Sequence, residues 1–106
     1  ASAPNNIGLC LVELEKYSES LPYFDRAIEI KQDYHHAYYN KASALDLLEE
    51  FDQALTACNQ AIQFVPDDRW GYYNLRTRLL LQLDRLEEAL LESDRTIEIF
   101  ERSVTG

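Results

Sequence analysis

The residues most suited to chemistry are two adjacent histidines, His35 and His36, with carboxylates nearby at Asp33 and Asp46. Histidine and carboxylate side chains can bind a metal ion or transfer protons. On a helix, however, neighbouring residues point about 100° apart, so the two imidazoles cannot easily bind one metal ion. No familiar ligand spacing joins them to the aspartates, and no glycine-rich loop is present to bind a phosphate. We therefore predict no catalytic residue, no metal site and no cofactor, and expect that the protein is not an enzyme.

The two cysteines, Cys10 and Cys58, are the remaining reactive side chains. They are far apart in the sequence, and both sit among Ala and Leu residues. Cysteine in such surroundings behaves as a small apolar side chain. We expect both to be core residues, and a redox or disulfide role is the alternative.

The charge of the chain limits its partners. Its 106 residues include 10 Lys and Arg against 19 Asp and Glu, a net charge of −9, and the basic residues are scattered from Lys16 to Arg102. A protein that binds nucleic acid gathers basic residues on one face, so we predict no nucleic-acid partner. No segment approaches the roughly 18 apolar residues of a membrane span, and no signal peptide is evident. We expect no membrane association and a soluble, cytoplasmic protein.

The elements that position these residues recur along the chain. Small and apolar residues repeat about every 34 positions, and each block contains two segments with the i, i+3, i+4, i+7 spacing of amphipathic helices. We predict an all-α protein with a single domain over 1–106 and repeats at about 1–34, 35–68 and 69–102. About six helices are expected, at 5–15, 18–31, 35–49, 52–65, 69–83 and 86–101. Asp52 is a plausible cap of the fourth, and Pro22 is expected in the first turn of the second.

The third block aligns with the second in two ways that differ by one residue. Counting forward from Pro66 aligns Tyr72-Tyr73-Asn74 with Tyr38-Tyr39-Asn40. Counting back from Leu86 instead puts Thr77 at the small position. Either the connection before this helix is one residue longer, which we favour, or the helix absorbs an extra residue as a π-bulge. The choice decides where the tyrosine and the asparagine point.

This pattern resembles the tetratricopeptide repeat family over nearly the whole chain, from Asn5 to about Glu101. The family's small residue in the first helix is matched by Gly8 and Ala42, and its aromatic residue at the turn by Tyr17 and Phe51. Its alanine in the second helix is matched by Ala54 and Ala61, and its closing proline by Pro66. The resemblance implies a right-handed α-solenoid of antiparallel helix pairs, whose first helices line a concave groove. In this family peptides usually lie in that groove.

The groove-facing positions of the family, carried over residue by residue, give a candidate peptide-binding set. Its members are Asn6, Leu9, His36, Tyr39, Asn40, Ser43, Trp70, Tyr73, Asn74 and Thr77. Asn5 and Glu13 of the first repeat and Leu47 of the second occupy further such positions. Under the backward count the third repeat contributes Gly71, Asn74, Leu75 and Arg78 instead.

Amides recur within this set. Asn6 and Asn40 are equivalent, and Asn74 joins them under the forward count, which would give a ladder of amides along the groove. A side-chain amide has both donors and an acceptor, so it can pair with an extended peptide backbone. The alternative is that these residues solvate a helix face or bond to a neighbouring helix.

The tyrosines are expected to divide between core and groove. Tyr38 and Tyr72 fall at the family's packing position and are expected in the core. Tyr39 and Tyr73 are expected to be exposed, where aromatic side chains would contribute to a binding surface.

The resemblance implies a protein–protein interaction module that binds a peptide or protein segment in an Asn- and Tyr-lined groove. One variant of the family binds carboxylate ends with basic residues, but Asn5, Trp70 and Asn74 occupy those places here, so charge-assisted bonds to a carboxylate are missing.

The alternative function is structural. The chain would then be a self-assembling fragment of a longer array, forming a homo-oligomer through its uncapped C-terminal helix. Ile97 and Phe100 leave apolar surface there, whereas Ser93 and Thr96 are expected to make that end more polar.

Overall fold

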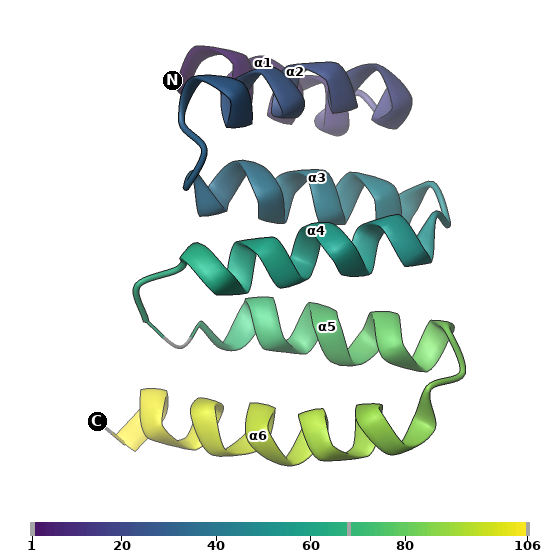
Figure 1. The fold of residues 1–106 in the computed structure, drawn as a ribbon, viewed down its shortest axis with the longest axis vertical. Helices are drawn as coiled ribbons and strands as arrows, with labels where there is room; N and C mark the ends of the chain where they lie inside the picture. The colour runs from purple at the N-terminus through teal and green to yellow at the C-terminus, as the bar shows by residue number, and fades with distance from the viewer. Residues whose placement is uncertain (1, 68, 106) are drawn as a thin grey trace.

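The structure of the chain is a computed structural model that describes residues 2–67 and 69–105. These residues form six α-helices and no strand, so the predicted all-α fold is confirmed. The helices are α1 (Ser2–Glu13), α2 (Tyr17–Ile30), α3 (His35–Leu47), α4 (Phe51–Phe64), α5 (Trp70–Gln82) and α6 (Leu86–Thr105). They form antiparallel pairs stacked along the longest axis of the molecule (Figure 1). No helix in this described part is long and apolar enough to cross a lipid bilayer.

The two helices of each pair are joined by the same tight turn. Glu15, Glu49 and Asp84 have positive φ angles of 60°, 62° and 60°. The backbone N–H that follows each of them donates to a carbonyl five residues back, at 2.8 to 2.9 Å. A residue in the left-handed conformation at this position ends the helix. The N–H that follows it pairs with a carbonyl of the last turn that would otherwise lack a partner. The turns lie 34 and 35 residues apart, so the structure repeats with the period seen in the sequence.

α1 begins at Ser2, three residues before the predicted start at residue 5, and two residues near other helix starts are placed differently from the prediction. Asp52 is the second residue of α4, whose N-cap residue is Glu50 without a side-chain hydrogen bond, so Asp52 is not the cap. As an acid in the first turn it still interacts favourably with the helix dipole, as Glu19 does in α2. Pro22, expected in the first turn, lies inside α2, beyond the N–H groups that lack helical partners, because the Ser20 N–H already donates to the Lys16 carbonyl at 3.1 Å.

Small side chains lie where the helices of a pair approach most closely. A β-carbon added to Gly8 would lie 2.5 Å from the ring of Phe24, which is fully buried. One repeat later, Ala42 and Cys58 occupy the two equivalent positions in the same buried cluster. A smaller residue on the second helix thus accompanies a larger one on the first, which keeps the interior filled.

The two cysteines have different environments. Cys58 is fully buried, its Sγ lies 3.4 Å from the carbonyl oxygen of Tyr72, and burial raises the pKa of its thiol to about 12. Cys10 is exposed, so the expectation of a core residue is wrong for it. Its equivalent in α3, Ala44, is fully buried, and α3 has α2 packed against one of its sides. The matching side of α1 has no neighbouring helix among the described residues.

The third repeat follows a longer connection. Residues 65–69 join α4 to α5, whereas residues 31–34 join α2 to α3, and α5 is a regular α-helix. The favoured alternative is therefore confirmed, and Tyr73 and Asn74 are the equivalents of Tyr38 and Tyr39.

Replacing Gly8 with alanine is expected to destabilise the protein by about 1–3 kcal/mol, because crowding against Phe24 outweighs the roughly 1 kcal/mol that alanine contributes as a better helix former. Urea denaturation followed by circular dichroism measures the difference. The matched control is Gly71→Ala, since a β-carbon there would meet only the Tyr39 hydroxyl, at 3.8 Å. Gly8→Ala at least as stable as the unaltered chain would contradict the close approach.

Candidate functional site

The first helices of the three pairs, α1, α3 and α5, form what we call the inner face. α3 contacts both α1 and α5, whereas the second helices α2, α4 and α6 make no contacts with one another among the described residues. In a curved stack, the layer whose helices lie closer together is on the concave side. The inner face is therefore the concave side, where the candidate binding residues were expected.

Asn40 bonds to the neighbouring first helix. Its side-chain amide donates to Oδ1 of Asn5 at 3.0 Å, and the Asn5 amide donates to the Tyr34 hydroxyl at 3.4 Å. Asn5 is buried and Asn40 is half-buried, so the alternative of a bond to a neighbouring helix holds for Asn40. Asn6 is exposed, but the residue equivalent to Asn6 and Asn40 in the third repeat is Leu75, which is buried. The predicted ladder of three equivalent amides is therefore wrong.

Tyr39, predicted to be exposed, is half-buried. Its ring stacks on Tyr72 of α5, with 4.3 Å between centroids and 12° between planes. Burial raises the pKa of the Tyr39 hydroxyl, while its hydrogen bond with Ser43 lowers it. Tyr39 thus joins α3 to α5, and only part of its surface is open to a ligand. Tyr72 and Tyr38 are buried, as predicted.

Tyr73 and Thr77 lie between α5 and α6, away from the inner face. Tyr73 is 5% exposed, and the guanidinium groups of Arg76 and Arg95 lie 5.2 and 5.1 Å from its ring centroid. Thr77 is buried, and its hydroxyl donates to the Tyr73 carbonyl at 3.1 Å and lies 3.4 Å from that of Thr96. The extra residue in the preceding connection turns both side chains toward α6. The prediction that these two line the groove is therefore wrong.

Asn74 and Arg78 take the inner-face positions that Tyr39 and Ser43 hold in the second repeat. Asn74 is half-buried, whereas Arg78 is exposed and donates to Asp46 of α3 at 2.7 Å. This ion pair joins α3 to α5. The backward count in the sequence selects Arg78, but only the structure shows that Asp46 is its partner.

The other candidates lie at the edges of this face or are open to solvent. Leu9 and His36 are exposed, and Ser43 is half-buried. Trp70 is the first residue of α5, and its ring centroid lies 5.5 Å from that of Phe100 on α6. Because it packs against the second helix of its own pair, Trp70 lies beside the inner face rather than within it.

The adjacent histidines bond to different partners. Nδ1 of His35 lies 2.9 Å from the Tyr72 hydroxyl, and Nε2 of His36 accepts a hydrogen bond from Arg69 at 3.3 Å. Burial lowers the pKa of His35, and the neighbouring His36 and the positive charge of Arg69 lower it further. In residues 2–67 and 69–105, no three His, Cys, Asp or Glu side chains are placed to hold one metal ion.

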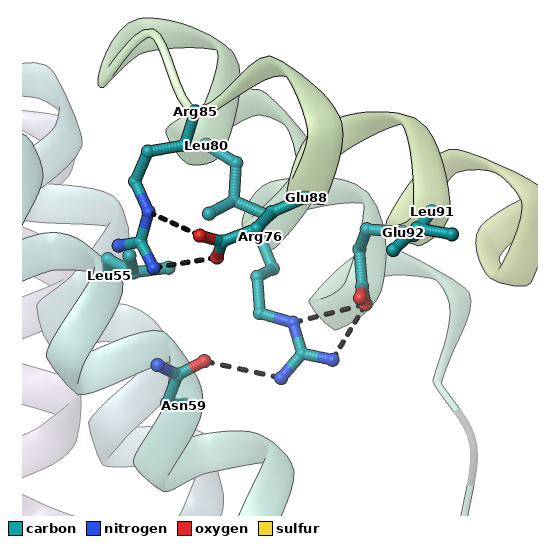
Figure 2. Close-up of a pocket in the computed structure, with 8 residues that line it drawn as sticks. All are labelled: Leu55, Asn59, Arg76, Leu80, Arg85, Glu88, Leu91 and Glu92. Atoms are coloured by element: carbon teal, nitrogen blue, oxygen red, sulfur yellow. Dashed lines mark hydrogen bonds and ion pairs between the residues drawn. The ribbon is translucent and has the colours of Figure 1, made fainter.

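A cavity of about 350 Å³ lies between α4, α5 and α6 (Figure 2). Arg76 donates to Glu92 at 2.7 Å, and Arg85 donates to Glu88 at 2.6 Å. Each arginine thus has an acidic partner beside the cavity. None of its lining residues belongs to the candidate binding set.

Sequence comparison identifies the family. Tetratricopeptide repeat models match residues 1–34 and 36–68, which together make up more than half of the chain. With the stacked helix pairs described above, these matches show that the chain belongs to the tetratricopeptide repeat family. Its repeats are generally protein-interaction modules. No curated protein matches the chain.

Solved structures share the fold, a right-handed α-solenoid. MamA AMB-1 in crystal form P212121 is 24% identical with a TM-score of 0.84, over 92% of this chain and 53% of that one. MamA 41-end from Desulfovibrio magneticus RS-1 is 22% identical with a TM-score of 0.86, over 95% of this chain and 56% of that one. YrrB, a TPR protein with an unusual peptide-binding site, is 20% identical with a TM-score of 0.82, over 91% of this chain and 49% of that one. The chain thus spans about half the length of these proteins.

Lowering the pH from about 7.5 to about 5.5 is expected to destabilise the protein partly through His35. Folding lowers the pKa of His35 from its usual value of 6.5. Its contribution to stability is therefore fully present above that value and is lost as the pH falls toward the folded pKa. Urea unfolding at both pH values measures the change. The unaltered chain should lose more stability than His35→Gln, and equal losses would contradict this role.

Proposed function

We propose that the inner face binds a peptide or a segment of another protein, and that the chain is a non-enzymatic interaction module. The observation that best supports this is the exposure of apolar side chains beside polar ones on this face. Leu47 is 52% exposed and Leu9 is 39% exposed, and His36 and Arg78 are exposed as well. A peptide can bury apolar side chains on such a surface while its backbone finds hydrogen-bond partners.

The polar groups of the inner face have bonding capacity left for a ligand. Asn40 gives one amide hydrogen to Asn5, so its other amide hydrogen and its oxygen can pair with a peptide backbone. Arg78 bonds to Asp46 through one terminal nitrogen, and its remaining N–H groups can donate to carbonyl or carboxylate oxygens. In the proposed complex the backbone of the ligand meets these two side chains, and an apolar side chain of the ligand meets Leu47.

The charge of the chain favours one class of partner. A net charge of −9 repels nucleic acid and disfavours acidic peptides. We therefore propose a protein partner whose bound segment is neutral or basic. Complementary charge of this kind raises the rate of association.

A peptide-library screen, followed by fluorescence anisotropy on the peptides that bind, tests this proposal. Leu47→Glu is expected to weaken binding by about tenfold or more, because it places a charge in the apolar contact. Ile30→Glu is the matched control, since Ile30 is 56% exposed but ends α2, outside the inner face. Equal binding by the unaltered chain and both variants, or an equal loss of binding in the two variants, would contradict a ligand site on the inner face.

A second candidate function is a scaffold that assembles by self-association, and the observation that favours it lies at the end of the stack. Leu86, Leu90 and Ile97 of α6 are all exposed. Thr96, expected to make this end more polar, is buried beside Thr77 instead. We propose that this apolar side of α6 is an association surface.

A further inference from the structure

The chain builds one kind of interface twice, where the second helix of a pair packs against the first helix of the next pair. α2 packs against α3, and α4 packs against α5. Leu55 of α4 lies in the buried cluster that includes Leu75 and Leu79 of α5, and it is 7% exposed. Its equivalent in α6 is Leu90, which is 66% exposed. α6 therefore has the same apolar surface that α4 buries against the next pair, but no described helix packs against it.

α1 presents the other half. Leu79 of α5, buried beside α4, is equivalent to Ala44 of α3 and to Cys10 of α1. Leu79 and Ala44 are fully buried, whereas Cys10 is exposed. Leu14 is likewise exposed, although its equivalent, Leu48, is half-buried. The uncovered side of α1 is therefore the surface that receives a second helix elsewhere in the molecule.

We propose that copies of the chain associate head to tail, with α6 of one copy packed against α1 of the next as α4 is packed against α5. This inference rests on the second candidate function and names its partner, a second copy, and the surface that receives it. α1 and α6 lie at opposite ends of the stack (Figure 1), so each bound copy keeps one free end. Because the two surfaces differ, the contact is heterologous and adds copies in a row.

A polar contact inside the molecule is missing from the contact between copies. Lys41 of α3 forms an ion pair with Asp25 of α2 at 2.7 Å. At the equivalent positions, Arg76 of α5 donates a hydrogen bond to Asn59 of α4 at 3.2 Å. Between copies these positions are held by Ile7 of α1 and Asp94 of α6, which cannot form that bond. Each copy also carries a net charge of −9, so the association strengthens with added salt. Ile7→Lys should restore the ion pair and tighten the association.

Sedimentation velocity from about 1 µM to about 1 mM tests the surface on α6. The unaltered chain is expected to sediment faster as its concentration rises, and Ile7→Lys to do so at lower concentration. Leu90→Glu should abolish the effect, because it places a carboxylate in the apolar contact. Leu91→Glu is the matched control with the same added charge: Leu91 is 73% exposed, but its equivalent, Thr56, is exposed too and so lies outside the internal interface.

Mixing two blocked variants tests the head-to-tail arrangement. Leu90→Glu blocks α6 and leaves α1 intact, whereas Cys10→Glu blocks α1 and leaves α6 intact. Each variant alone should stay monomeric, and an equimolar mixture should form a dimer that grows no further. Circular dichroism confirms that both variants fold.

The possible failures are distinct. An unaltered chain that stays monomeric throughout the series would overturn both the self-association function and the head-to-tail contact. Association that is lost in Leu90→Glu but not restored in the mixture would overturn only the head-to-tail contact, since α6 would then pair with another α6. Equal loss in Leu90→Glu and Leu91→Glu would show that added charge, rather than the internal interface, governs association.

Discussion

A helix pair of this chain cannot bury its apolar surface alone, and the rest of the structure depends on that constraint. Within the first pair Gly8 lets α1 approach Phe24, and between pairs Leu55 and Leu79 share one buried cluster. The principal contacts join each helix to the next in the chain, so the fold is a line of nearest-neighbour interfaces. Among the described residues, this line leaves one side of α1, one side of α6 and the inner face uncovered, and the two candidate functions use these different surfaces.

The sequence is sufficient to predict six helices and their family, because small and apolar residues recur at helical spacing. It is not sufficient to place side chains after a connection of uncertain length. A helix turns about 100° per residue, so the one additional residue before α5 directs Tyr73 into its own pair and brings Arg78 to the inner face. Composition around Cys10 predicts burial, but burial also requires a covering helix, and none of the described helices covers α1 there.

Several predicted binding residues also hold the stack together. Asn40 bonds to Asn5, and Tyr39 stacks on Tyr72, so each joins two first helices. The partners lie about one repeat away in the sequence, and residue type alone does not reveal such pairings. A ligand on the inner face would therefore meet side chains whose positions are already fixed by neighbouring repeats. Fixed groups of this kind reduce the entropy that binding costs.

Native-state hydrogen exchange, measured at a concentration that keeps the chain monomeric, tests most directly whether the fold is a line of nearest-neighbour interfaces. We predict the slowest exchange in α3 and α4, which have packed pairs on both sides, and faster exchange toward α1 and α6, each of which has one side without a described helix against it. Equal protection in all six helices, at the free energy of global unfolding, would contradict this, because the chain would then open only as one unit.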